Sequence, residues 1–417
     1  MGLVLRALRP VLICLAVAAP AVVLRLLGVE LPAPVALLVF GAAVVAASFM
    51  LAWAAEAAEH DISGGLAIAI LAVIVVLPEY AVDLYFAYTA GSNPEHVAYA
   101  AANMTGSNRL LLGVGWAVVV IVALAVAGKR SGRPVKAVVL DTGYRLELGF
   151  LAIASILSFL IPISGRIHLV LGIALLGLFV FYLVRAAQGE SDDELDLVGP
   201  AARIGDLPTA QRRGLVIGLF VVAAGLILFC AEPFANALVD SGTVLGIDQF
   251  LLVQWLAPLA SEAPELIVAV IFAVRGKAAP AIGMLISAKV NQWTLLVGSL
   301  PVAYLAGGGS VALPMDGRQV EEFVLTAAQT LLGIAALLSL RFSRVLAWTL
   351  FGLFVVQFLI PGTEGRLILS AVYGVLAIGA MIMHRRQLIP TLLAPFRREA
   401  AIVAHEPEPV RDRASVG

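Results

Sequence analysis

Two glutamates follow prolines inside long apolar runs of the sequence. Pro78-Glu79 occurs in VIVVLPEYAVDLYF, and Pro264-Glu265 occurs in QWLAPLASEAPELIVAV. A carboxylate in the middle of a membrane helix costs at least about 3 kcal/mol to insert. The neighbouring proline frees a carbonyl oxygen one turn earlier, which is tolerated only beside a protein-lined or watery cavity. Because carboxylate and carbonyl oxygens are the ligands of hard cations, the sequence predicts a cation site at Glu79 and Glu265.

Each of these glutamates has a second carboxylate nearby. Asp83 follows Glu79 by four residues, and Glu262 precedes Glu265 by three. Both spacings place two side chains on one face of a helix. Two close carboxylates in a low-dielectric environment do not both ionise without a cation, so each pair is suited to bind a cation or to carry a proton. An alternative for Asp83 is a position close to the outer membrane interface.

Small and polar residues follow each Pro-Glu segment at a similar distance. The tripeptide GSN (106–108) begins 27 residues after Glu79, and SAK (287–289) begins 22 residues after Glu265. The difference indicates a short insertion near 92–96. Interrupted helices in corresponding halves of a chain mark the binding site of a secondary transporter.

These two blocks, about 90 residues in all, resemble the alpha repeats of the calcium/cation antiporter superfamily, which includes the sodium/calcium exchangers. The flanking helices agree with the superfamily in number and order only. The resemblance implies that Glu79 and Glu265 are the paired ion-ligand glutamates and that Asn108 offers a carbonyl oxygen. It also implies a secondary active antiporter that exchanges Ca²⁺ or another cation against H⁺ or Na⁺ by alternating access. The ions would bind at the membrane midplane, and no cofactor is expected beyond the transported Ca²⁺, Na⁺ or H⁺.

The chain departs from the superfamily beside both Pro-Glu segments. Glu262 stands where exchangers usually have a small hydroxyl residue, although Ser261 keeps one hydroxyl. The first repeat has Val76 and Leu77 there, and neither supplies a hydroxyl. Fewer hydroxyl ligands leave the number of bound ions open.

The largest departure is Lys289, which stands where an asparagine is expected. Its ammonium group is a built-in monovalent cation opposite the buried carboxylates. Three roles stay open at this point: a permanent counter-charge in a former sodium site, the carrier of the coupled proton, or a structural ion pair with Glu262 or Glu265.

Amide side chains complete the candidate site. Asn103 and Asn108 could offer oxygens, or they could cap a helix start, and Asn291 and Gln292 could restore an oxygen after Lys289. Arg109 is a further cation that we expect to face a helix end. The candidate ion ligands are Glu79, Glu265, Asp83, Glu262, Asn108, Asn103, Ser261 and Asn291, with Lys289 as the coupling or counter-charge group and with Glu79 and Glu265 as the metal ligands.

Composition places these residues in a membrane. The chain has 417 residues, of which 61% are hydrophobic and 13% charged, with a mean hydropathy of +1.01, whereas soluble domains are closer to half apolar and a quarter charged. The net charge of −1 gives no indication of a nucleic-acid partner, and Cys14 and Cys230 lie in apolar runs that predict buried free thiols. The expected partners are small cations and the lipid bilayer, and the oligomeric state is open.

Runs long enough to cross the membrane lie at 11–27, 34–56, 64–89, 96–127, 146–163, 167–186, 214–239, 249–274, 279–305, 320–340, 345–360 and 366–383.

These runs predict an all-α polytopic membrane protein of about twelve transmembrane helices. Lysines and arginines in the loops favour a cytoplasmic N-terminus, since only Arg166, Arg318 and Arg366 would then lie outside. Both termini would be cytoplasmic, in the cell (plasma) membrane. Helices two to six and seven to eleven form two sets of five; because five is odd, the second set is inverted. The predicted domains are an extra N-terminal helix (1–30), the first half (31–187), an acidic cytoplasmic linker (188–213), the second half (214–362), and an extra helix with a disordered tail (363–417).

The sequence can also be compared with what other functions require. An intramembrane enzyme needs a nucleophile–base pair, a His-Glu-x-x-His helix or a paired-aspartate signature, and the sequence contains none of them, so no enzyme is predicted. A non-transporting membrane scaffold gives no reason for two interrupted helices with matched carboxylates. A Na⁺/H⁺ antiporter with a degenerate second site stays as an alternative. The acidic linker is either a solvated connection or a regulatory calcium sensor.

Overall fold

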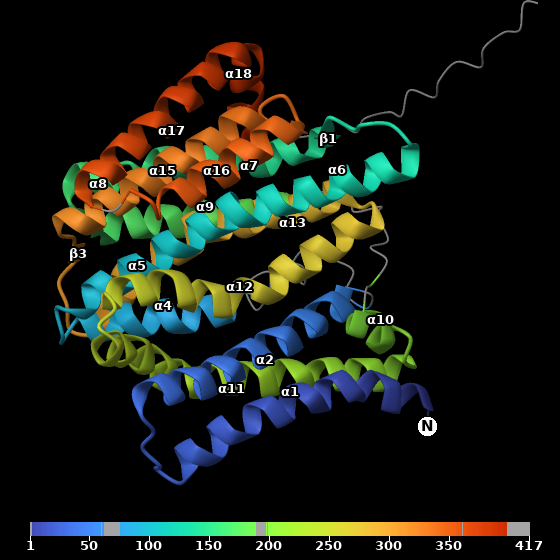
Figure 1. Ribbon diagram of the computed structural model, residues 1–417, viewed down its shortest axis with the longest axis vertical. Helices are drawn as coiled ribbons and strands as arrows, with labels where there is room; N and C mark the ends of the chain where they lie inside the picture. The colour runs from blue at the N-terminus through green and yellow to red at the C-terminus, as the bar shows by residue number, and fades with distance from the viewer. Residues whose placement is uncertain are drawn as a thin grey trace, which may run out of the picture.

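The computed structural model describes residues 2–59, 61, 76–188, 197, 199–360 and 362–397, and these are almost entirely helical (Figure 1). Among them, nine helices are long and apolar enough to cross a membrane, and α16 (Arg344–Val356) is a shorter apolar helix. The predicted all-α, polytopic fold class is confirmed, whereas the total of twelve spans stays a prediction. Part of the predicted span 64–89, the acidic run 190–196 and the tail from 398 lie outside the described residues.

The first half of the chain runs from the N-terminal helices to α9. Its elements are α1 (Gly2–Leu26), α2 (Ala33–Glu59), α4 (Leu77–Ala90), α5 (His96–Leu110), the π-helix η1 (Leu111–Trp116), α6 (Ala117–Ser131), β1 (Ala137–Val139), η2 (Thr142–Tyr144), α7 (Arg145–Ser158), α8 (Leu160–Ser164), β2 (Arg166–His168) and α9 (Leu169–Ala186).

The second half repeats this order after a short connecting helix. Its elements are α10 (Gly199–Gly205), α11 (Thr209–Leu245), α12 (Gln249–Arg275), α13 (Ala278–Asn291), the π-helix η3 (Gln292–Leu296), α14 (Val297–Ala306), β3 (Ala312–Pro314), α15 (Gly317–Leu337), β4 (Arg341–Ser343), α16, α17 (Thr363–Met383), α18 (Arg385–Leu393) and η4 (Ala394–Phe396).

A π-helical turn interrupts the corresponding helix of each half. η1 begins at Leu111, three residues after Asn108, and η3 begins at Gln292, three residues after Lys289. π-Turns inside α-helices occur frequently at functional sites. Their equal offsets support the alignment of Lys289 with Asn108. The preceding connections differ, since residues 91–95 separate α4 from α5 whereas residues 276–277 separate α12 from α13.

Two short antiparallel ribbons connect the halves to each other, which the helix pattern of the sequence did not predict. β1 pairs with β4, with Val138 opposite Phe342, and β2 pairs with β3, with Ile167 opposite Leu313. By their order in the repeats, β1 corresponds to β3, and β2 corresponds to β4. The β1–β4 ribbon is therefore equivalent to the β3–β2 ribbon when the two halves are interchanged. In Figure 1, β1 and β3 lie at opposite ends of the helices. This is the arrangement expected of an inverted repeat.

Helices outside the repeats flank the bundle. α1 packs against α2 and α11, whereas α17 packs against α15, and Figure 1 shows α1 and α17 at opposite ends of the long axis. Between them, α12 packs against α5, α4 and α13. Gly106 allows the α5 backbone to meet α12, since a Cβ there would lie 1.8 Å from the backbone oxygen of Gln254. The backbones of α5 and α12 are therefore in direct contact beside the GSN tripeptide.

Candidate functional site

The two Pro-Glu segments lie in different helical settings. Pro78 and Glu79 are in the first turn of α4, where a proline is compatible with helix geometry and a carboxylate is favoured by the helix dipole. Pro264 instead lies inside α12, so the carbonyl of Ala260, one turn earlier, receives no hydrogen bond from it. Each setting presents a glutamate beside a discontinuity in backbone hydrogen bonding.

The structure brings four predicted carboxylates together from α4 and α12. Glu79, Asp83 and Glu262 are buried, with 6%, 0% and 2% of their surface exposed. Glu265 is half-buried. Glu79 lies within electrostatic range of the other three. Asp83 is therefore inside the protein and close to Glu79.

Many oxygen and nitrogen atoms around these carboxylates have no hydrogen-bond partner in the described protein. An unsatisfied buried polar atom costs about 1–3 kcal/mol, and native structures contain few of them. A concentration of such atoms therefore indicates a place where a ligand or water completes the coordination. They are Oε1 of Glu79, both carboxylate oxygens of Asp83, Oε2 of Glu262, both amide atoms of Asn103, Oγ of Ser107, Oδ1 of Asn108, Oδ1 of Asn291 and Oε1 of Gln292.

Lys289 of α13 is fully buried. Its Nζ donates a hydrogen bond to the backbone oxygen of Asn108. It lies within electrostatic range of Glu262 and Glu79, but it forms no ion pair with any carboxylate that the structure describes. The structural ion pair expected as one alternative is therefore not what holds this lysine.

Hydrogen bonds orient several groups around the site. Gln292 donates from Nε2 to Oε1 of Glu262 at 2.7 Å, and Tyr80 donates to the backbone oxygen of Asn291 at 3.4 Å. Ser261 donates to its own helix, to the oxygens of Ala257 and Pro258. Gln292 thus fixes one Glu262 oxygen and leaves the other open to the site.

Asn103 and Asn108 make different contacts. Asn103 lies beside Asp83, whereas Asn108 donates from Nδ2 to the oxygen of Met104 in its own helix at 3.1 Å. Neither caps a helix start, since both lie within α5.

Within the described ranges, no three His, Cys, Asp or Glu side chains are grouped to hold a metal ion. A bound cation would therefore need amide or backbone oxygens besides the carboxylates.

Arg109 lies in the last turn of α5, and it contacts Gln357, the C-cap residue of α16. Its guanidinium forms a 2.5 Å ion pair with Glu322 of α15, with side chains only 3% and 1% exposed, and it donates to Gln357 at 3.0 Å. Arg366 of α17 contacts Glu322 from the other side at 2.7 Å. Helix packing brings these charges together because α5 and α17 both lie against α15.

Glu322 and Arg366 were missed as candidates. A usable signal was present, because Glu321 and Glu322 lie in the predicted span 320–340. A carboxylate there is as costly to insert into a membrane as the carboxylate of Glu79.

The sequence profile of the sodium/calcium exchanger protein family matches residues 32–187 and 215–361. The chain belongs to the sodium/calcium exchanger family. It is therefore a multi-pass membrane transporter rather than an enzyme.

Solved structures agree with this membership. A structure titled "Crystal Structure of H+/Ca2+ Exchanger CAX" is 41% identical, covers 93% of this chain and 96% of its own, and has a TM-score of 0.86. The Ca²⁺/H⁺ antiporter YfkE, at 17% identity, matches 88% of this chain and 99% of its own with a TM-score of 0.58. The sodium-calcium exchanger NCX_Mj, at 18% identity, matches 77% and 95% with a TM-score of 0.50. The last two support the fold alone, and no curated protein matches.

Proposed function

We propose that this member of the family is a secondary antiporter that exchanges Ca²⁺ against H⁺ by alternating access. The ion site would lie between α4, α5, α12 and α13, near the membrane midplane. The counter-ion follows from two points: the 41% identical relative is an H⁺/Ca²⁺ exchanger, and the site holds an ammonium group where the superfamily pattern has an amide.

One observation carries the proposal. Three buried carboxylates, those of Glu79, Asp83 and Glu262, have oxygens without a partner in the described protein. Buried carboxylates that are not paired with fixed cations need mobile ones. Two protons and one divalent cation carry the same positive charge, so either can neutralise the same carboxylates. A site that accepts either one can exchange Ca²⁺ for H⁺.

Glu79 and Glu262 would be the main Ca²⁺ ligands, with Glu265 joining them as the site opens. Ser261 and the amide oxygens of Asn108 and Asn291 would complete the oxygen shell, as Ca²⁺ takes six to eight oxygens in flexible geometry. Asp83 of α4 and Asn103 of α5 are fully buried and lie beside each other. This pair would accept protons or an entering cation rather than share the same ion.

Lys289 would act as a tethered monovalent cation. Its ammonium already uses the backbone oxygen of Asn108, an oxygen that a sodium ion could otherwise bind. A fixed positive charge beside Glu262 and Glu79 lowers the number of mobile charges the site needs. We therefore propose the permanent counter-charge role over the proton-carrier role.

The orientation and division of the chain are part of the same proposal. Both termini would be cytoplasmic in the cell membrane. The extra N-terminal helix (1–30), the two halves (31–187 and 214–362), the linker (188–213) and the C-terminal helix with its tail (363–417) keep the boundaries expected from the sequence.

Flux measurements in proteoliposomes test the proposal. We expect ⁴⁵Ca²⁺ uptake when protons are driven the opposite way, and no uptake when only a sodium gradient is imposed. Matched vesicles carrying Glu79→Gln should be inactive. Uptake driven by sodium at constant pH would contradict the proton assignment, and ²²Na⁺ flux driven by pH without Ca²⁺ flux would favour the Na⁺/H⁺ alternative.

A further inference from the structure

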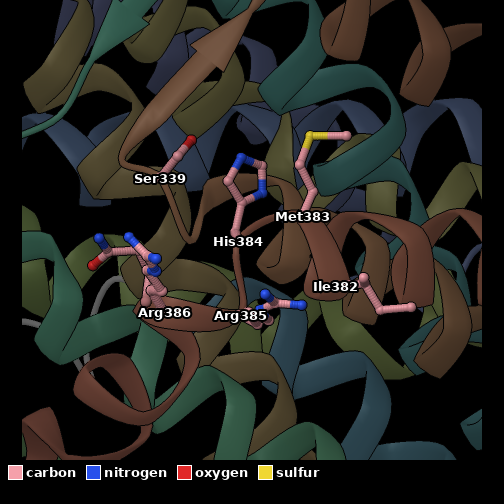
Figure 2. Close-up of a pocket in the computed structure, with 7 residues that line it drawn as sticks. Ser339, Ile382, Met383, His384, Arg385 and Arg386 are labelled. Atoms are coloured by element: carbon pink, nitrogen blue, oxygen red, sulfur yellow. The ribbon is translucent and has the colours of Figure 1, made fainter.

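A pocket of about 600 Å³ lies at the junction of α17 and α18, away from the carboxylate site. Figure 2 shows Ser339, His384 and Arg386 around it, with Ile382 and Met383 on the side away from Arg386. Arg385 completes the basic part of its lining, and none of the lining side chains is acidic. From the geometry we infer that this pocket binds the phosphate headgroup of an anionic phospholipid.

The charges of the pocket are available to a ligand. Arg385 and Arg386 are exposed and have no hydrogen-bond or ion-pair partner within the part of the chain that the structure describes. Nδ1 of His384 is buried, and it too has no partner in that part of the chain. The two exposed guanidinium groups offer the donors that a phosphate prefers.

The framework of the pocket is held firmly by its neighbours. Arg145 of α7 donates to Gln387 at 2.8 Å and to Thr391 at 3.0 Å, which fixes α18 in place. Leu340, which follows the lining residue Ser339 in the chain, has a φ of 55°, an unfavourable conformation for a bulky residue. Its backbone oxygen accepts a hydrogen bond from Leu140 at 2.8 Å. The free arginines therefore stand on a preorganised frame rather than on a loose loop.

The apolar side favours a lipid over a soluble phosphate. Ile382 and Met383 form the last turn of the membrane helix α17 and are 61% and 78% exposed. Beyond the arginines, Ile389 and Phe396 are also exposed. A phospholipid whose headgroup lies at Arg385 and Arg386 would place its acyl chain along α17. Lysines and arginines at the cytoplasmic end of membrane helices attract anionic lipids in this way, and the loop charges of the sequence favour that end here.

Binding of phosphatidylglycerol to the full-length protein tests the inference. Native mass spectrometry in a neutral detergent would compare the wild type, Arg385→Gln with Arg386→Gln, and a control carrying Arg133→Gln with Lys136→Gln. The control removes the same charge from exposed residues of the same expected face. We expect the first variant to lose affinity by about fivefold per arginine and the control to stay near the wild type. Equal losses, or none in the first variant, would overturn the assignment.

Two further arms identify the occupant. Glycerol phosphate or inorganic phosphate at the lipid concentration should fail to displace phosphatidylglycerol, and Met383→Ala should weaken lipid binding. Full displacement by inorganic phosphate would show a soluble anion site instead.

Discussion

Lys289 of α13 donates a hydrogen bond from its ammonium group to the backbone oxygen of Asn108 of α5. These two residues hold equivalent positions in the inverted repeats, since each precedes a π-helix by three residues. This hydrogen bond thus joins the two halves at a pair of equivalent positions that carry different side chains. The first half has an amide at this position, and the second half has an ammonium group.

Replacing Lys289 by Asn removes this cation and restores a family-like amide. We expect Ca²⁺ flux to become sodium-dependent and the charge moved per cycle to change, because the vacated position can hold a mobile monovalent ion. Lys129→Asn, at an exposed lysine, should leave both unchanged. Flux and membrane current in proteoliposomes measure these quantities. Loss of pH-driven flux with intact Ca²⁺ binding would instead assign the coupled proton to Lys289.

Replacing Glu79 by Gln keeps its volume and removes its charge from the site. We expect Ca²⁺ affinity to fall at least about tenfold, because the affinity of such sites follows the number of charged ligands. Membrane insertion and expression should stay normal. Glu232→Gln is the matched control, since Glu232 is exposed and paired with Arg25. Wild-type ⁴⁵Ca²⁺ flux in Glu79→Gln would remove Glu79 from the site.

Gln292 should act by positioning Glu262. Glu262→Gln keeps an oxygen for the 2.7 Å hydrogen bond from Gln292 but removes the charge, so we expect transport to stop. Gln292→Leu keeps the charge but frees the carboxylate. There we expect weaker Ca²⁺ affinity with transport retained at saturating Ca²⁺. Titration of flux against Ca²⁺ separates the two effects, and identical behaviour of the two variants would argue against a positioning role.

Glu322 should contribute strongly to folding stability, in contrast to its neighbour Glu321. Glu322→Gln leaves the buried guanidinium of Arg109 without its 2.5 Å partner, and breaking a buried ion pair costs about 3–5 kcal/mol. Glu321→Gln removes only a 3.6 Å contact with Arg366 and should have little effect. Thermal unfolding in detergent distinguishes them. Arg109→Gln combined with Glu322→Gln should recover part of the loss, and no recovery would mean that the pair is not coupled.

The ion pair of Asp61 with Arg212 should give stability a pH dependence at low pH. The Arg212 guanidinium donates to both Asp61 oxygens at 2.6 Å and lowers the pKa of Asp61 to about 2 from 3.8. The contribution is complete above about pH 4, near the pKa of an unfolded aspartate, and is lost as the pH falls through the folded value. Asp61→Asn should therefore be less stable at pH 7 and lose less between pH 4 and pH 2. Parallel unfolding curves over that range would contradict this.

Much of the helix pattern followed from the sequence because membrane helices obey simple length and hydropathy rules. The predicted run 96–127 appears as α5, η1 and α6, and 249–274 appears as α12. The sequence also predicts that Glu79, Asp83 and Glu262 belong to a site, because a carboxylate in an apolar run is costly to bury unless it has a function.

Other features depend on contacts between distant segments. The residues next to Arg109 in the sequence do not indicate its partner, and only the packing of α5 against α15 brings Glu322 to it. The same holds for Gln292, whose bond to Glu262 spans α12 and η3. The free-energy cost of burying a charged or polar group predicts from the sequence that the group needs a partner. Which residue becomes that partner depends on the tertiary fold.

The two β-ribbons also constrain how the protein can be made. β1 must wait for β4, since Val138 pairs with Phe342, and β2 must wait for β3, since Ile167 pairs with Leu313. At about 5–20 residues per second, the ribosome needs roughly 10–40 seconds to supply the missing strand of the first ribbon. During that time the first half is inserted in the membrane with strand edges that lack their partners. The order of synthesis thus leaves a period in which a chaperone, or the first half of another copy, can reach those edges before the second half does.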